Sequence, residues 1–428
     1  MYGFLVELNS TYKSTDFGRI PVDWDVVAMQ NFSKCLIGLT YSPRDVSESG
    51  TLVLRSSNVQ GGRLAFDDNV YVRMALPARV IVEENDILIC VRNGSRQLIG
   101  KCALIDKETA GSAFGAFMSV LRSDAAKFVF FQFQSSLLKR QIDEVMGATI
   151  NQITNKNMAE FKIFWPPKKR ERDAIAEALG DADALIESIE QLIAKKRHLK
   201  QGAMQELLNG KKRLSGFGGE WVEKSLGALF DFSGGYSASR EQLSAEGHCY
   251  LHYGDIHGAT KYFIDASNEF GDIPKLNIPL KRVSKSSLLE DGDVVFVDAS
   301  EDDEGTSKHV VIVNERQIPF ISGLHTIVAK AKTNELDRGY RQYCFQAGRI
   351  KRQFKFFAVG TKVSGISKAN IAKILVSIPP TLSEQNAIAT ILSDMDAELA
   401  ALEQKLAKAR QIKQGMMANL LTGKIRLV

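Results

Sequence analysis

The chain contains one segment twice, and this duplication constrains its fold more than any other feature. Residues 166–214 align without a gap with residues 379–427, at a constant offset of 213. Pro166-Pro167, for example, recurs as Pro379-Pro380. Self-similarity of this length predicts two copies of one structural unit, so any function of that unit is expected to occur twice.

Each copy predicts a long helix after its two prolines. The prolines favour a helix start, the following residues are mostly strong helix formers, and Gly210 and Gly423 favour left-handed caps at the two ends. Apolar residues recur in steps of three and four over several heptads, which is typical of a coiled coil. The predicted seam residues are Ile175, Leu179, Ile186, Ile189, Ile193 and Leu207 in the first copy, and Ile388, Leu392, Met395, Leu399, Leu402, Leu406 and Leu420 in the second.

A lysine occupies one seam position in each copy, Lys200 in the first and Lys413 in the second. A lone polar residue at a seam fixes the register of a helix pair at some cost in stability. The alternative is that each helix packs only on its own domain. The shared heptad register would then be a coincidence, so we favour pairing of the two helices within the chain.

The regions before the helices correspond more weakly. Trp24 and Trp221 stand at an offset of 197, and residues 86–89 resemble residues 293–296 as the start of a buried strand. Because the offset drifts, loops of different length separate common elements. A shared scaffold with diverged globular regions predicts two units with different targets. The chain also ends at the point of the repeat where it begins, which fits a closed, pseudo-two-fold ring.

The bulk properties exclude several classes of protein. A length of 428 residues predicts two or three domains, and 44% hydrophobic residues argue against global disorder. Five cysteines without CxxC spacing argue against a disulfide framework or a zinc ribbon. The absence of a long apolar run and of signal-peptide features predicts a cytoplasmic protein without membrane contact. A net charge of +5 permits nucleic-acid binding but does not require it.

Catalytic and cofactor motifs are missing from the sequence. We find no Walker motif, no GxGxxG after a strand, and no Asn/Asp/Ser-Pro-Pro-aromatic motif of adenine or cytosine methyltransferases. The histidines lack zinc-type helical spacing, although His248, His252 and His257 cluster in a strand-turn context. We therefore expect no catalytic residue, no metal site and no cofactor on this chain.

Two polar loops are candidates for DNA contact. Residues 38–44 and their counterpart 234–240 combine glycine, hydroxyls, tyrosine and arginine, which suit phosphates and a guanine edge. Residues 92–96 follow a buried strand, whereas their counterpart 298–304 is acidic and would repel phosphate. An ordinary surface turn explains each loop about as well from the sequence alone. The candidate DNA-binding residues are Thr40, Tyr41, Ser42, Arg44, Arg92, Asn93, Ser95, Arg96, Tyr236, Ser237, Ser239 and Arg240.

Together these motifs resemble HsdS, the DNA-specificity subunit of type I restriction-modification systems. The resemblance rests on the opening YKSTDFGRIPVDWDVV, on Glu171 and Glu384 with Ala-Ile-Ala after the Pro-Pro pairs, and on the closing LLTGKIRL. It covers essentially the whole chain. The first helix departs from the family pattern, because it opens with Pro-Pro-Lys-Lys-Arg-Glu-Arg, so its capping is not predicted by the resemblance.

The resemblance implies an α+β protein with two mixed α/β target-recognition domains, separated by two long helices that form an antiparallel coiled coil. The implied segments are an N-terminal segment 1–21 that completes the circular repeat, recognition domains at 22–167 and 215–380, and helical spacers at 168–214 and 381–428.

The implied role is that of a non-catalytic subunit in host defence. Each recognition domain would read one half of a split double-stranded DNA target, while the helices set the spacer and dock two methyltransferase subunits. Those partners would carry S-adenosylmethionine, and restriction subunits would add ATP and Mg²⁺ chemistry. The alternatives are a stand-alone DNA-modifying enzyme and a coiled-coil oligomerisation protein. The recognised bases, the spacer length and the methylated base are not predicted.

Overall fold

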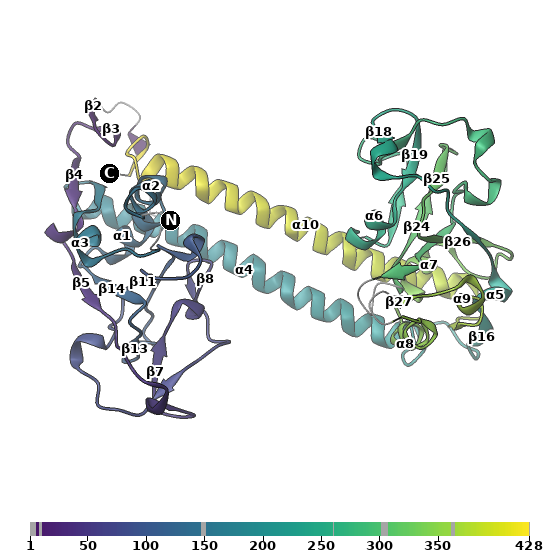
Figure 1. The fold of residues 1–428 in the computed structure, drawn as a ribbon, viewed down its shortest axis with the longest axis horizontal. Coiled ribbons are helices and arrows are strands. Elements are labelled where there is room, and N and C mark those ends of the chain that lie inside the picture. The colour runs from purple at the N-terminus through teal and green to yellow at the C-terminus, as the bar shows by residue number, and fades with distance from the viewer. Residues whose placement is uncertain are drawn as a thin grey trace. The chain divides into compact units, whose positions relative to one another are not determined.

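Two compact units and two shared helices make up the chain. The computed structural model describes residues 6–7, 11–146, 151–259, 261–300, 307–360 and 364–427. Unit 1 comprises Met1–Glu190 and Gln404–Val428, and unit 2 comprises Gln191–Glu403. The helices α4 (Lys169–Leu207) and α10 (Leu382–Leu420) have 39 residues each and contribute one part to each unit (Figure 1).

The helix boundaries follow the proline and glycine signals. Each helix begins two residues after its second proline, Pro167 or Pro380. Beyond the ends of the helices, Gly210 has φ +66° and Gly423 has φ +69°, the left-handed conformation that stops a helix. The predicted starts and caps are therefore confirmed.

Ion pairs show that α4 and α10 pack antiparallel in each unit. In unit 1, Lys413 Nζ lies 2.6 Å from Asp183 Oδ1, and Arg410 Nη2 lies 2.8 Å from Glu190 Oε1. The pairs of unit 2, each 213 residues away from its counterpart, are Lys200–Asp396 and Arg197–Glu403. Residue numbers rise along α4 as they fall along α10, so the expected antiparallel arrangement is present. The seam lysines are not lone polar groups, because each has a carboxylate partner across the seam.

None of the predicted seam residues is exposed. Some of them pack in the cores of the globular regions, and the others pack between the two helices. The residues near the helix ends join the cores of the globular regions: Ile175, Leu179 and Leu420 in unit 1, and Leu207, Ile388 and Leu392 in unit 2. Residues such as Ile186 and Ile193, which are 6% and 4% exposed, belong to the two-helix middle. The coiled coil is therefore shorter than the heptad pattern, since the same pattern continues where the helices pack on domains.

The globular part of unit 1 is built on short sheets with helices at one side (Figure 1). Its central sheet has the order β12-β11-β14-β5, all antiparallel, and a second sheet has the order β13-β7-β10-β6. The strands are β1 (Val6–Glu7), β2 (Tyr12–Thr15), β3 (Gly18–Pro21), β4 (Asp25–Ala28), β5 (Lys34–Ile37), β6 (Val46–Ser47), β7 (Thr51–Leu54), β8 (Val59–Gln60), β9 (Arg63–Leu64), β10 (Tyr71–Val72), β11 (Ile87–Cys90), β12 (Cys102–Leu104), β13 (Ala113–Phe114), β14 (Met118–Arg122), β15 (Lys162–Trp165) and β29 (Arg426–Leu427). The short helices are α1 (Ala126–Phe133), α2 (Ser136–Val145) and α3 (Asn155–Glu160).

Unit 2 repeats this plan with a larger central sheet. That sheet has the order β17-β26-β22-β24-β20, and a second one has the order β18-β21-β19-β25. The strands are β16 (Val222–Ser225), β17 (Phe230–Gly234), β18 (Leu243–Ser244), β19 (His248–Leu251), β20 (Phe263–Asp265), β21 (Lys275–Leu276), β22 (Val294–Val297), β23 (Ala299–Ser300), β24 (His309–Val313), β25 (Phe320–Ser322), β26 (Thr326–Ala331), β27 (Ser364–Gly365) and β28 (Leu375–Ile378). The helices are α5 (Leu226–Leu229), α6 (Tyr253–Gly258), α7 (Arg338–Cys344), α8 (Gly348–Phe357) and α9 (Lys368–Ile371).

The two strands predicted to be buried, β11 and β22, divide the core of each unit into two layers. Side chains alternate between the two faces of a strand. Ile87 and Ile89 therefore join the core that includes α4, whereas Leu88 and Cys90 join the core of the second sheet. In unit 2, β22 divides its side chains between two cores in the same way. The continuous apolar run of each strand reflects this burial on both faces.

An arginine near the end of each copy of the repeat binds a buried glutamate in the first turn of a long helix. Arg426 Nη2 donates to Glu171 Oε2 at 2.8 Å, and its Nη1 and Nη2 reach both oxygens of Asp23 at 2.9 Å. Its counterpart Arg213 binds Glu384 in unit 2, with an Nη2–Oε2 distance of 2.7 Å. Both glutamates are 1% exposed, so each negative charge depends on its arginine.

The unusual start of the first helix is also explained. Arg172 Nη1 donates to the carbonyls of Pro166 and Pro167 at 2.7 and 3.0 Å. At the equivalent position of the second helix, the Gln385 amide donates to the carbonyl of Pro379 at 3.1 Å. The two side chains differ, but each satisfies the turn that precedes its helix.

The chain termini meet within unit 1. Strand β1 pairs antiparallel with β29, so Val6 lies opposite Leu427. Figure 1 marks both chain ends beside the globular part of unit 1. This pairing is what the circular relation of the sequence predicts, because the C-terminus continues into the start of the repeat.

Candidate nucleic-acid interface

A close approach of two glycines fixes the first candidate loop of each unit. In unit 1, Leu39 N donates to Phe114 O at 2.7 Å, and a Cβ on Gly38 would lie only 2.1 Å from Gly115 O. In unit 2, a Cβ on Gly235 would lie 1.7 Å from Gly323 O. Glycine is therefore required for packing against the turn that leads into β14 or β26. Glycine is needed here because two backbone segments approach each other closely. This reason differs from the phosphate binding that the composition suggested.

In unit 1 the loop after β5 ends in a capped turn of 3₁₀ helix, Pro43–Asp45. Ser42 accepts from Arg44 N at 3.3 Å, and Asp45 accepts from Ser42 N at 2.7 Å, so Ser42 has a local role. Thr40 and Arg44 are exposed, and Tyr41 packs partly against the second core. Among the described residues the Arg44 guanidinium has no hydrogen-bond partner, so it is available to a ligand.

The equivalent loop of unit 2 has the same design with different side chains. Ser239 and Gln242 form the capping box of a 3₁₀ turn, while Tyr236 is partly buried and Ser237 is exposed. Arg240 is exposed and makes no hydrogen bond within the described part of the chain. Its guanidinium lies next to Gly254 at the start of α6.

Burial lowers the pKa of His252, and the charge of Arg240 lowers it further. The imidazole is therefore neutral near pH 7, which agrees with its Nδ1 accepting from Gly254 N at 3.0 Å. Arg240 and α6 thus form one polar surface in unit 2.

In the second candidate loop, after β11, some polar side chains bind other parts of the protein and others are free to contact a ligand. The Asn93 amide donates to Ser56 Oγ at 3.2 Å and accepts from Ser95 N at 3.0 Å. Arg96 donates to Asp143 O at 3.1 Å. These contacts occupy both polar ends of Asn93 and part of the Arg96 guanidinium. Arg92 is exposed and lies over the ring of Phe117, with 5.3 Å from Cζ to the ring centroid.

The acidic counterpart in unit 2 is described only in part, because residues 301–304 lie outside the described residues. Asp298 directly follows β22. Its Oδ1 lies 3.4 Å from Nδ1 of the exposed His325. An acidic group thus stands near the position that Arg92 occupies in unit 1.

Sequence reasoning missed the turn before β14 and β26. This turn carries Phe117 in unit 1 and His325 in unit 2, next to the candidate loops. The available signal was a glycine followed two residues later by a ring, Gly115 with Phe117 and Gly323 with His325. The drifting offset hid this correspondence, because it is 208 at the turn.

Several buried titratable groups have structural partners. Asp86 binds Arg122 with an Oδ2–Nη2 distance of 2.7 Å, and Asp293 binds Lys330 at the equivalent place. Burial lowers the pKa of His309 to about 4, so this core histidine is neutral. No group of three His, Cys, Asp or Glu suited to a metal occurs among the described residues. The exposed groups of these surfaces can donate hydrogen bonds and stack, which suits recognition of a nucleic acid.

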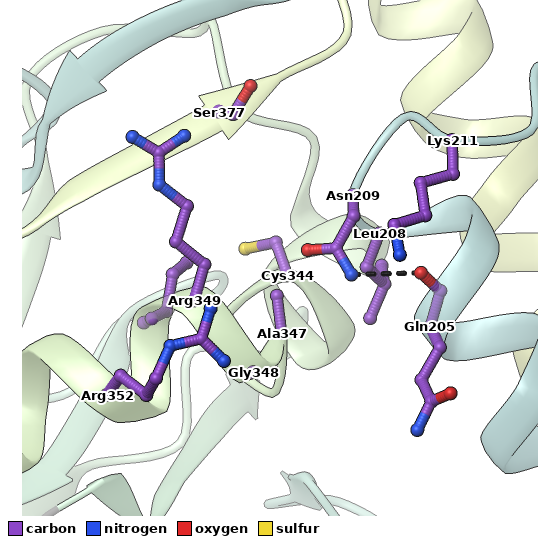
Figure 2. A pocket seen from close by; sticks show the side chains of 11 residues that line it. Gln205, Leu208, Asn209, Lys211, Cys344, Ala347, Gly348, Arg349, Arg352 and Ser377 are labelled. Carbon is purple, nitrogen blue, oxygen red and sulfur yellow. Dashed lines mark hydrogen bonds between the residues drawn. The ribbon is translucent and has the colours of Figure 1, made fainter.

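Unit 2 contains a cavity beside the end of α4 (Figure 2). It has a volume of about 460 Å³, and Figure 2 shows Lys211 on one side and Arg349 and Arg352 of α8 on another. Its lining residues are Gln205, Leu208, Asn209, Lys211, Cys344, Ala347, Gly348, Arg349, Ile350, Arg352 and Ser377. Burial raises the pKa of Cys344, so its thiol is a poor nucleophile at neutral pH.

In unit 1 a buried glutamine stands at the position equivalent to Cys344. Cys344 of α7 corresponds to Gln132 of α1, and both precede Phe-Gln. The Gln132 amide is 0% exposed and donates to the carbonyls of Phe164 and Leu421 at 3.1 and 3.4 Å. The shorter side chain of Cys344 therefore accounts for a small part of the cavity in unit 2 and not for its whole volume.

Replacing Gln132 with alanine is expected to destabilise the protein by about 1–3 kcal/mol, because two buried carbonyls lose a donor. The matched change Cys344→Ala should cost clearly less, since Cys344 already borders a cavity. Urea unfolding followed by circular dichroism measures both. Equal losses for the two variants would contradict the assigned role of Gln132.

Comparison with known proteins agrees with this architecture. The family model of the type I restriction modification DNA specificity domain matches twice, at residues 21–195 and 218–411. The putative type I restriction enzyme MjaX specificity subunit of Methanocaldococcus jannaschii is 24% identical over 97% of both chains. The type I restriction enzyme EcoKI specificity subunit of Escherichia coli is 28% identical over 45% of this chain and 44% of its own.

A solved structure shows the same fold. The type I restriction-modification system S subunit from M. genitalium matches with a TM-score of 0.58 and 17% identity, over 93% of this chain and 96% of that chain. The chain therefore belongs to the type I restriction-modification DNA specificity family, whose members are DNA-recognition components and not the catalytic ones. None of the described helices combines the length and the apolar character that crossing a membrane requires.

Proposed function

We propose that this chain reads a two-part DNA target for a type I restriction-modification complex, one half with each unit. The observation that carries the proposal is the duplication itself. Equivalent loops occur at equivalent places in both units, but they present different groups: Arg44 and Arg92 in unit 1, Arg240 and Asp298 in unit 2. A shared scaffold with different exposed groups is what the reading of two different half-sites requires.

The helices would separate the two half-sites and bind the partner subunits. Fixed spacing makes the second half-site an intramolecular binding event, which raises affinity only when the spacing matches. Each unit also exposes apolar side chains on its helices, such as Leu199 (51%) in unit 2 and its counterpart Ile412 (52%) in unit 1. Equivalent apolar positions on both helices suit two copies of one partner, the methyltransferase subunit.

The chemistry would reside on those partners. Methyltransferase subunits would supply S-adenosylmethionine, and restriction subunits would supply ATP-driven and Mg²⁺-dependent cleavage, in the cytoplasm. Methylome sequencing of cells that carry this chain with its methyltransferase tests the proposal. A two-part methylated motif with a fixed gap is expected. Methylation or cleavage by the chain alone would favour a stand-alone enzyme, and a lack of sequence preference in the complex would favour a structural protein.

Single arginine substitutions test whether each unit reads its own half-site. Arg92→Ala is expected to weaken or relax recognition of one half-site by about 1–3 kcal/mol, the value of a bidentate base contact. Arg240→Ala should act on the other half-site. Binding of the complex to DNA with changes in either half measures both effects.

Arg96→Ala is the matched control, because part of its guanidinium is held by Asp143 O. It should leave base preference nearly unchanged. Equal losses at both half-sites for Arg92→Ala would argue against reading by separate units.

A further inference from the structure

An exposed ring occupies the same turn in both units. Phe117 stands before β14 in unit 1 and is 57% exposed. His325 stands before β26 in unit 2, and its side chain is 51% exposed. The two are equivalent in backbone hydrogen bonding, because Val91 N donates to Phe117 O at 3.1 Å and Asp298 N donates to His325 O at 3.2 Å. In both turns the ring lies two residues after the glycine that contacts the first candidate loop.

Packing does not account for either ring. Met118, which follows Phe117, is 1% exposed, so the chain turns inward directly after an aromatic side chain that it leaves in solvent. His325 has φ +59°. This left-handed conformation costs about 1–2 kcal/mol for a residue with a Cβ, and glycine adopts it freely. Strain of this kind, kept at an exposed side chain, is characteristic of functional sites.

Both rings lie beside side chains of the candidate interface that are free to contact DNA. The Phe117 ring supports the guanidinium of Arg92 at 5.3 Å. The His325 ring lies edge-on to Tyr253, with 5.6 Å between centroids and an interplanar angle of 82°. Tyr253 in turn packs on His252 at 4.5 Å, beside Arg240. Each ring therefore stands within the polar surface of its own unit.

We infer that Phe117 and His325 are specificity-determining residues that contact base edges, Phe117 for the half-site of unit 1 and His325 for that of unit 2. This inference rests on the proposed function. A phenyl ring offers only apolar contact, which suits the methyl group of thymine. Nδ1 of the His325 imidazole faces Asp298 Oδ1 at 3.4 Å, which leaves Nε2 to make one hydrogen bond with a base edge. The change from phenylalanine to histidine between equivalent turns makes the two units prefer different bases.

His325→Gly provides the sharpest test, because it removes the ring and also the backbone strain. The complex with the methyltransferase subunit is assayed for binding to the motif found by methylome sequencing and to DNAs with single base changes in each half. Discrimination at one position of the unit 2 half-site should fall about tenfold, the low-to-middle range for one base contact. The thermal stability of the variant should equal or exceed that of the unchanged protein.

Phe117→Ala is tested in the same way and should lower discrimination at one position of the other half-site. Leu324→Ala and Phe66→Ala are matched controls, because these side chains are 42% and 45% exposed but lie outside the two ring positions. They should leave discrimination unchanged.

Unchanged discrimination in a stable His325→Gly complex overturns the inference, and so does a loss spread over both half-sites. Failure of the proposed function is a separate result, since the unchanged complex would then show no two-part target at all.

Discussion

Removal of one heptad from both helices is expected to shorten the preferred spacer between the half-sites and to leave the half-sites themselves unchanged. Seven residues at ~1.5 Å each shorten a helix by about 10 Å, which corresponds to about three base pairs at ~3.4 Å. Seven residues also complete two turns of a coiled coil, so the apolar seam stays on the same face.

The ion pairs allow the deletion to be designed more closely than the heptad pattern alone. From the sequence, residues 186–192 and 399–405 would be an obvious choice. The pairs Arg410–Glu190 and Arg197–Glu403 indicate that residues 189–195 and 402–408 lie opposite each other. Deleting these two segments keeps both seam lysines with their aspartates. It removes the pairs Arg410–Glu190 and Arg197–Glu403, together with the part-buried pair of Glu190 with Arg63.

Methylome sequencing of cells with the doubly deleted chain measures the new gap. Deletion of residues 189–195 alone is the control, because it shifts one helix against the other and should prevent assembly of an active complex. An unchanged gap in the double deletion would remove the idea that the helices set the spacer.

Arg426→Ala is expected to destabilise unit 1 by about 3–5 kcal/mol, the cost of leaving a buried charge without its partner. Glu171 is 1% exposed, and Arg426 binds it together with Asp23. The hydrogen bond to Glu171 raises the pKa of Arg426 above its usual range, so the guanidinium is charged at every pH of interest. Urea unfolding of the unchanged and variant chains measures the loss.

Arg410→Ala is the matched control, because it breaks an ion pair between side chains that are 58% and 32% exposed. Its cost should stay below about 1 kcal/mol. Adding Glu171→Gln to Arg426→Ala should restore part of the stability by removing the unpaired charge. A loss below about 1 kcal/mol for Arg426→Ala would mean that water solvates Glu171 in the variant.

The pH dependence has a defined sign at this site. Burial acts to raise the pKa of Asp23, but its hydrogen bond with Arg426 and the charge of that residue outweigh burial and lower the pKa. A lowered pKa contributes stability above the ordinary value of 3.8 and loses it as the pH falls through the folded-state value. Compared with Glu171→Gln alone, the double variant Arg426→Ala with Glu171→Gln should therefore show a stability that depends less on pH in this acid range.

The repeat predicted the helices and their ends from prolines and glycines, and their pairing from a heptad pattern. The antiparallel direction of the pair was implied by the resemblance. It did not predict where the coiled coil stops, since Ile175 and Ile388 fit the same heptads but pack on globular cores. The spacing of apolar residues alone does not show whether a helix face packs on another helix or on a globular domain. The resemblance supplied the recognition domains, which the weak similarity around Trp24 and Trp221 only suggested.

The candidate loops show a second limit. Composition selected Asn93 and Ser42 as readily as Arg92 and Arg44, because all four carry polar groups suited to DNA. The structure separates them, since Asn93 and Ser42 satisfy local backbone groups. It also adds Phe117 and His325, which composition did not select because an isolated ring before an apolar strand resembles an ordinary core residue.

The division of the chain has a consequence for its synthesis on the ribosome. Unit 2 is one continuous stretch, Gln191–Glu403, whereas unit 1 needs both Met1–Glu190 and Gln404–Val428. Unit 2 therefore has all of its residues once Glu403 has been added, whereas unit 1 also needs the later segment Gln404–Val428. A premature stop late in the coding sequence removes Arg426 and the final part of α10. Such a truncation removes part of unit 1, although most of unit 1 was made first, and it leaves every residue of unit 2 in place.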